Sequence, residues 1–263
     1  MGARDRRHSA LPIALVILLL GMSASSTLYS DDRAELAEED SPLNTHSGLN
    51  FPGSTHGSIY SLTAIGAGYN YTCVVMDTNG MKCWGKGGTG YLGNGGSYTV
   101  HEPVAVNMPT YPPTAVEMSG GDGHHTCMIV SNGSFYCWGE DFNGQIGHSH
   151  YSCGGWCNSP HGPSTLGGKA ALTIVTGIHH TCAIAVDQTL YCWGRDDNGQ
   201  VGDGFPTGGH HTPTHIELPP NRTAVAVNAA ADASCVILDN GSGMCWGLNM
   251  NGHLGIGTND SKD

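Results

Sequence analysis

Hydrophobic residues along this chain come in runs of four or five, separated by glycine, asparagine, serine and proline. One stretch shows the pattern clearly, with β-like runs at 103–106, 115–118, 126–130 and 134–138. Short apolar runs bounded by turn residues predict β-strands, and Asn132-Gly133 between the last two runs predicts a tight hairpin. The pattern therefore predicts an all-β protein with four short strands in this stretch.

The same stretch recurs four times. Each copy contains a Trp-Gly step, and a Gly-x-x-Gly step begins six residues after each tryptophan. The Trp-Gly pairs are Trp84-Gly85, Trp138-Gly139, Trp193-Gly194 and Trp246-Gly247, with tryptophans 54, 55 and 53 residues apart. Four strands in a repeat of this length are typical of one propeller blade. We interpret the tryptophans as core between blades rather than as exposed sugar-stacking residues.

Two cysteines lie ten positions apart in every repeat, and in the second repeat they are equidistant from Asn132. Residues that face each other in an antiparallel pair have Cβ atoms about 4.5–5.5 Å apart, and a disulfide needs about 3.8 Å. The spacing therefore predicts four hairpin disulfides, whereas it is not a usual zinc spacing. The pairs are Cys73–Cys83, Cys127–Cys137, Cys182–Cys192 and Cys235–Cys245.

The repeat resembles that of the regulator of chromosome condensation family. The second copy reads Gly-His-His-Thr at 123–126 and Gly-Gln-Ile-Gly at 144–147, and the third reads Gly-Ile-His-His-Thr at 177–181 and Gly-Gln-Val-Gly at 199–202. The first copy departs from the pattern at Tyr71 and Tyr91, and the fourth at Ala233 and His253. The resemblance implies a seven-bladed propeller, so this chain is expected to form four four-stranded blades of a partial, open propeller. A fragment of a longer protein, pairing with a second chain and a closed four-bladed ring are the three explanations considered.

The N-terminal part predicts export. Residues 1–26 combine an arginine-rich start, an apolar run at 10–22 and a small-residue cleavage site, which is the pattern of a signal peptide. Residues 27–57 are predicted to be an acidic and polar disordered spacer, and 58–263 to hold repeats at about 58–96, 97–150, 162–205 and 212–257. Ten cysteines fit a secreted or extracytoplasmic, surface-displayed protein. The alternative is that the N-terminal segment stays uncleaved and anchors the chain in a membrane.

The insertion 148–161 interrupts the repeat and contains the only cysteines outside the hairpin pattern, Cys153 and Cys157. They could join His148, His150 or His161 in a zinc site, but in an exported chain a local disulfide is favoured. Aromatic residues are enriched among interface anchors, so the loop is the predicted binding surface. Its binding candidates are Tyr151, Trp156, His148, His150 and His161.

Other polar residues are interpreted structurally. His125 and His180 recur in repeat register, which favours a structural hydrogen bond over a catalytic or metal role. Asp141-Phe142-Asn143-Gly144 and Asp196-Asp197-Asn198-Gly199 lack the remainder of a calcium loop, so Asx turns are predicted there.

The functional prediction is a binding scaffold with no catalytic residues, no metal and no cofactor, because none of the common catalytic or phosphate-binding motifs occurs. A formal charge of −12 argues against nucleic-acid binding. The expected partner is a protein of unknown identity. The alternatives are guanine-nucleotide exchange on a small GTPase, which the resemblance implies, and binding of an extracellular glycan.

Overall fold

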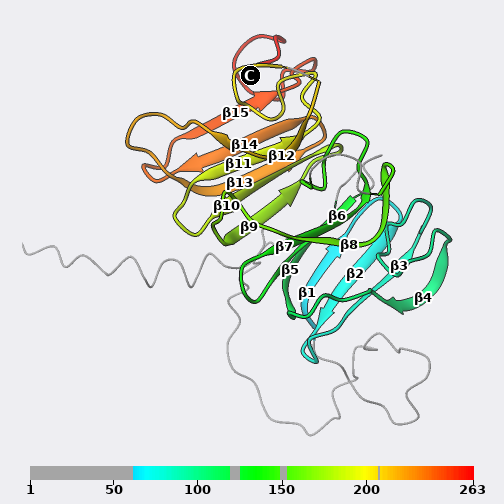
Figure 1. The fold of residues 1–263 in the computed structure, drawn as a ribbon. Helices are drawn as coiled ribbons and strands as arrows, with labels where there is room; N and C mark the ends of the chain where they lie inside the picture. The colour runs from blue at the N-terminus through cyan, green and yellow to red at the C-terminus, as the bar shows by residue number, and fades with distance from the viewer. Residues whose placement is uncertain (1–61, 119–124, 149–152, 207) are drawn as a thin grey trace, which may run out of the picture. The chain divides into compact units, whose positions relative to one another are not determined.

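A computed structural model describes residues 62–118, 125–148, 153–206 and 208–263, and all of its regular elements are β-strands (Figure 1). The predicted signal peptide and spacer lie outside these residues. The described residues contain no helix with the length and hydropathy needed to cross a bilayer. The strands are β1 (Leu62–Ala67), β2 (Tyr71–Met76), β3 (Met81–Gly85), β4 (Val100–Ala105), β5 (Pro113–Met118), β6 (His125–Val130), β7 (Phe135–Glu140), β8 (Trp156–Ser164), β9 (Ala171–Thr176), β10 (His180–Ala185), β11 (Leu190–Gly194), β12 (His210–Ile216), β13 (Ala224–Ala230), β14 (Ala233–Leu238) and β15 (Gly243–Gly247).

These strands form four antiparallel sheets that follow one another along the chain. The first three are four-stranded, with the orders β1-β2-β3-β4, β5-β6-β7-β8 and β9-β10-β11-β12. The fourth has the order β13-β14-β15, and Lys262 makes an isolated bridge with Gly247 of β15. The predicted all-β fold with four-stranded antiparallel sheets is confirmed, although the described part of the fourth sheet has three strands.

The sheets are offset by one strand from the strand sets grouped in the sequence. The run at 103–106 is grouped there with the strands that follow it, but in the structure it belongs to β4, which pairs with β3 of the preceding hairpin. Likewise β12 pairs with β11 and joins the third sheet. The apolar pattern shows that a strand exists, but its neighbour depends on where the chain returns after the Gly-x-x-Gly loop.

The central hairpin of each sheet places its cysteines directly opposite each other. In the second sheet Cys127 faces Cys137, with Cα atoms 4.1 Å apart, and the other three sheets repeat this separation. The sixth residue after the first cysteine has a positive φ in every hairpin, whether it is Asn79, Gly133, Gln188 or Gly241. The shared turn geometry explains the shared disulfide spacing, and all four predicted hairpin disulfides are present.

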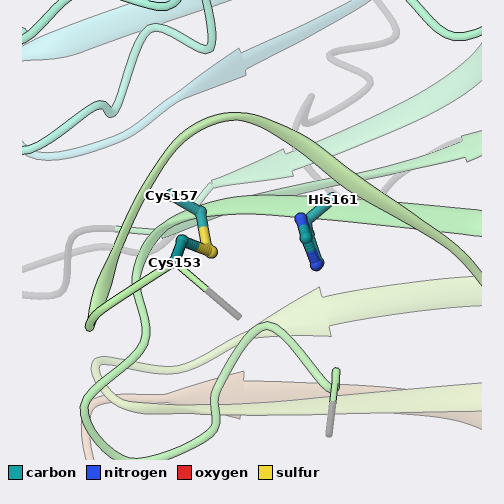
Figure 2. Close-up of side chains that lie close together, drawn as sticks. All are labelled: Cys153, Cys157 and His161. Carbon is teal, nitrogen blue, oxygen red and sulfur yellow. A yellow bond between two sulfur atoms is a disulfide. The ribbon is translucent and has the colours of Figure 1, made fainter. Parts of the chain in front are cut away.

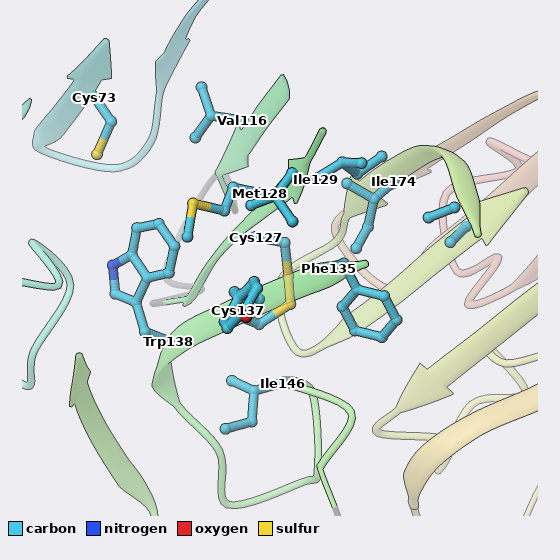
Figure 3. Packing of buried hydrophobic residues seen from close by; sticks show 14 of the residues in the cluster. Cys73, Val116, Cys127, Met128, Ile129, Phe135, Cys137, Trp138, Ile146 and Ile174 are labelled. Carbon is cyan, nitrogen blue, oxygen red and sulfur yellow. A yellow bond between two sulfur atoms is a disulfide. The ribbon is translucent and has the colours of Figure 1, made fainter. Parts of the chain in front are cut away.

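Three of the four repeat tryptophans, Trp138, Trp193 and Trp246, pack between neighbouring sheets as predicted. Trp138 and Trp193 are fully buried, and Figure 3 shows Trp138 beside Met128 near the Cys127–Cys137 disulfide. Each indole N–H donates to a carbonyl of the preceding repeat at 2.8–3.1 Å: Trp138 to Tyr91, Trp193 to Gln145 and Trp246 to Gln200. Trp246 is also buried, whereas Trp84 of the first repeat is only half-buried.

The recurring histidines also connect neighbouring sheets. His125 Nε2 lies 2.9 Å from Thr181 Oγ1, and His180 Nε2 lies 2.9 Å from Ser234 Oγ. The Thr181 and Ser234 hydroxyls donate their own protons to the carbonyls of Gln145 and Gln200, at 2.8 and 2.9 Å. Each hydroxyl oxygen therefore accepts from an imidazole N–H. The predicted structural hydrogen bonds of these histidines are confirmed.

Candidate binding surface on the loop between β7 and β8

The loop between β7 and β8 is closed by the disulfide that the sequence favours. Cys153 is bonded to Cys157, and Figure 2 shows His161 beside this disulfide. The two sulfurs and a His161 ring nitrogen lie within 4.8 Å of one another, which is close enough for a metal site. Both thiols are consumed by the disulfide, so no thiolate ligand is available there. With this pair, all ten cysteines of the chain are in disulfides.

The disulfide loop presents Trp156 on the surface. Trp156 opens β8, where it faces Glu140 of β7, and its backbone N–H donates to the carbonyl of Cys153 at 3.3 Å. The adjacent Cys157 is buried and faces Gly139. The backbone that carries Trp156 is thus held by a strand on one side and a covalent link on the other, yet 39% of the residue surface stays exposed.

Phe142 is the partner of Trp156. The two ring centroids are 4.5 Å apart at an interplanar angle of 85°, an edge-to-face contact that aromatic rings prefer. Phe142 is 47% exposed, so the pair forms a joint apolar surface. Gly155 makes this arrangement possible: it has a φ of +88°, and a Cβ there would collide with the Phe142 ring.

Two histidines lie near the disulfide. The rings of His148 and His161 are in edge contact, with centroids 4.3 Å apart. Burial lowers the pKa of His161, and the neighbouring His148 imidazole lowers it further. Both effects favour the neutral form of the His161 imidazole.

The structure brings together only part of the predicted site. Trp156, His148 and His161 lie in the described residues, whereas His150 and Tyr151 lie outside them. Phe142 was missed as a binding residue because it was assigned to an Asx turn. A signal was available, since the turn position that Phe142 occupies holds Gly88, Asp197 and Met250 in the other repeats. The turn does not require an aromatic side chain at this position.

The antiparallel sheets recur with the same period as the tryptophans, and buried tryptophans lie between neighbouring sheets. This arrangement defines a β-propeller scaffold. The family model described as "Regulator of chromosome condensation (RCC1) repeat" matches residues 187–237. A second model of that repeat matches residues 116–145 and 173–200. These matches identify RCC1 repeats in this part of the chain.

A curated relative is similar to the chain in sequence, and two solved structures are similar to it in fold. The ultraviolet-B receptor UVR8 of Arabidopsis thaliana is 28% identical over 193 residues, which cover 73% of this chain and 42% of the receptor. Human WBSCR16 superimposes with a TM-score of 0.69 at 16% identity, covering 79% of this chain and 52% of that one. Yeast RCC1 (Prp20), solved bound to Kap60, gives 0.67 at 20% identity, covering 78% and 48%. The chain thus spans about half the length of these proteins, or less.

Proposed function

We propose that this protein is an exported or surface-displayed β-propeller that binds a protein partner through Phe142 and Trp156 and catalyses no reaction. The observation that carries the proposal is the exposed edge-to-face aromatic pair on a disulfide-anchored loop. Large aromatic side chains that are fixed before binding lose little entropy on association, which is why they dominate binding energy at interfaces.

Export is supported by the cysteines and by the N-terminal pattern. Disulfides persist in oxidising compartments, and every cysteine of this chain is paired. The test is the intact mass of the protein after export, with and without alkylation under non-reducing conditions. Loss of about 26 residues and no alkylation support the proposal. An uncleaved chain with reactive thiols would overturn export and favour the nucleotide-exchange alternative.

A partner of protein class is supported by the scaffold. Yeast RCC1, which is similar to this chain in fold, was solved bound to Kap60, so at least one such protein binds another protein. The net charge of −12 disfavours the phosphate backbone of a nucleic acid as the alternative partner.

The binding test compares Phe142→Ala and Trp156→Ala with Phe205→Ala. Phe205 is 69% exposed and lies outside the aromatic pair, so it is a matched control for the loss of a surface ring. Partners would be cross-linked to the purified chain in extracellular fractions, identified by mass spectrometry and then purified for titration. Each site variant is expected to weaken binding by about 2 kcal/mol, or roughly 30-fold. Equal affinities for all three variants would place the interface elsewhere.

Glycan binding is the second candidate, because the exposed indole of Trp156 is a surface on which a sugar ring can stack. A glycan-array signal that disappears in Trp156→Ala and persists in Phe205→Ala would support this function and displace the protein partner. The absence of any array signal from the folded wild-type chain would remove it.

A further inference from the structure

Three ionisable side chains outside the aromatic pair converge in the third repeat. They are Asp196 in the turn after β11, Asp203 in the following loop, and His210 at the start of β12. The strand pairing explains the convergence, because His210 faces Gly194, two residues before Asp196. His210 Nε2 lies 3.6 Å from Asp196 Oδ2 and 3.2 Å from Asp203 Oδ2.

One carboxylate oxygen in this cluster is buried without a hydrogen bond. The Asp196 side chain is 0% exposed. Its Oδ1 accepts the backbone N–H of Val201 at 2.8 Å, but Oδ2 has no hydrogen-bond partner among the described residues and faces His210. A buried carboxylate oxygen that faces only other ionisable groups needs a positive charge beside it.

The orientation of His210 directs a ring nitrogen at the two carboxylates. Its Nδ1 lies 3.2 Å from Thr214 Oγ1, and the Thr214 hydroxyl donates to the carbonyl of Thr212 at 3.3 Å. The hydroxyl oxygen therefore accepts from Nδ1–H, and in the neutral imidazole the Nε2 lone pair points toward the aspartates. Metal-bound histidines are typically held in one tautomer by such an outer hydrogen bond.

The scaffold does not require this set of residues. At the position of Asp196 the other repeats have Gly87, Asp141 and Asn249, and Asn249 uses its amide group to donate to the carbonyls of Thr258 and Asp260. At the positions of Asp203 and His210 no other repeat combines a carboxylate with an imidazole. The cluster is thus specific to the third repeat, whereas the bond from Oδ1 to the loop recurs.

We propose that Asp196, Asp203 and His210 bind a divalent transition-metal ion of the zinc type. Tetrahedral coordination at about 2.0–2.1 Å places ligand atoms about 3.3 Å apart, and the two separations from His210 Nε2, 3.2 and 3.6 Å, lie close to this value. The ligand atoms all lie within 4.8 Å of one another. One imidazole with two carboxylates suits zinc better than calcium or magnesium, which prefer oxygen ligands alone. This site departs from the sequence-based expectation of no metal.

The local charge supports a cation of charge +2. The carboxylates of Asp203 and Asp263 lie close enough to Asp196 to interact with it electrostatically. Asp263 lies at the same junction, since it packs against Gly199 of the turn. Three carboxylates near one imidazole make the cluster negative, and a divalent ion compensates more of that charge than a monovalent one.

The test is a calorimetric titration with Zn²⁺. The full chain is used with its disulfides intact, after bound metal has been removed. The chain has 15 histidines, and others among them can also bind Zn²⁺. The decisive quantity is therefore the one equivalent of bound Zn²⁺ that is lost when the cluster is mutated. His210→Gln and Asp203→Asn are expected to abolish it or weaken it by at least about 10–100-fold, the range seen even for outer-shell losses. The matched control is His215→Gln, which removes an exposed histidine of the same strand and should leave it unchanged.

Two further variants separate the metal site from a structural role. Asp196→Asn retains an acceptor for the Val201 N–H and should keep the fold, checked by circular dichroism, while losing Zn²⁺. Thr214→Val should weaken affinity by about tenfold at unchanged stoichiometry, with Thr214→Ser restoring it. Wild-type Zn²⁺ binding by His210→Gln and Asp203→Asn would overturn the proposal. So would a wild-type chain in which the imidazole NMR signals of His210 do not change when Zn²⁺ is added.

Discussion

Acidification is expected to destabilise the contact between the third and fourth repeats through His180. The side chain is fully buried, and its Nε2–H donates to Ser234 Oγ at 2.9 Å. Nδ1 has no hydrogen-bond partner among the described residues, so a proton there would be a buried charge without an acceptor. Burial, reinforced by the neighbouring His179, lowers the pKa of His180 from 6.5 to about 4.

The sign and size of the effect follow from linkage. Between pH 6.5 and 4 the unfolded chain binds a proton at this histidine and the folded chain does not, so the free energy of unfolding falls as the pH falls. One pKa unit corresponds to about 1.4 kcal/mol. The depressed pKa of His180 therefore removes about 3 kcal/mol of stability across this window, and above pH 6.5 this contribution is fully present.

A second buried group works in the opposite direction. Burial raises the pKa of Asp141 from 3.8 to about 6, against the effect of a hydrogen bond from the Ile146 backbone. As the pH falls, the folded chain binds a proton at Asp141 at a higher pH than the unfolded chain does. The free energy of unfolding therefore rises by about 3 kcal/mol between pH 6 and pH 4. Because the two contributions nearly cancel, the pH profile of the wild-type chain alone is not a test.

The assay is urea unfolding followed by tryptophan fluorescence at pH 7, 6, 5 and 4, for the wild type and His180→Gln. The glutamine amide can still donate to Ser234 but does not titrate in this range. Between pH 7 and pH 4, the unfolding free energy of the wild type is expected to fall by about 3 kcal/mol relative to that of the variant. His215→Gln, which removes an exposed imidazole, gives the baseline. A pH-independent difference for His180→Gln would refute the reasoning, as would an imidazole NMR signal of His180 that titrates near pH 6.5 in the folded chain.

Three further outcomes are expected from the same unfolding measurements. Asp141→Asn keeps an acceptor for the loop and removes a buried charge, so it should raise the free energy of unfolding at pH 7 and abolish the gain on acidification; a less stable variant would contradict this. Replacing Cys127 and Cys137 together by alanine should lower the free energy of unfolding by about 2–3 kcal/mol, and no loss would mean that the hairpin restrains the unfolded chain little. Gly147→Ala should cost about 2 kcal/mol or more, because φ is +72° and the new Cβ would lie 2.6 Å from Trp193 Nε1; unchanged stability with an unshifted tryptophan spectrum would contradict the packing.

The hairpins could be predicted from sequence because the information that defines them is local. A ten-residue separation around a turn determines which residues face each other, and the Cys127–Cys137 pair follows directly. The sheet that a strand joins is not local information. The run at 103–106 has the same apolar pattern whether it pairs forward or backward. Its pairing with β3, in which Val104 faces Cys83, shows that it completes the preceding sheet.

The candidate sites depend on the same non-local pairing. Trp156 could be recognised as an off-register aromatic, but its contact with Phe142 exists because β8 returns beside β7 and places Trp156 opposite Glu140. Asp203 and His210 each look like isolated loop residues in the sequence. They lie near Asp196 because His210 pairs with Gly194, and no sequence motif predicts that pairing.

Repeat register separates the residues that the scaffold needs from those that it does not. His125 and His180 recur at one position and make one kind of inter-sheet hydrogen bond, so they are explained by the fold alone. The aromatic pair and the proposed set of metal ligands are combinations of side chains that the other repeats do not share. Both also arise at equivalent places, in the turn after a Trp-Gly step and at the start of the strand that pairs with its glycine. A rigid repeat in which these two segments vary can present different chemistry on successive blades without changing the contacts between them.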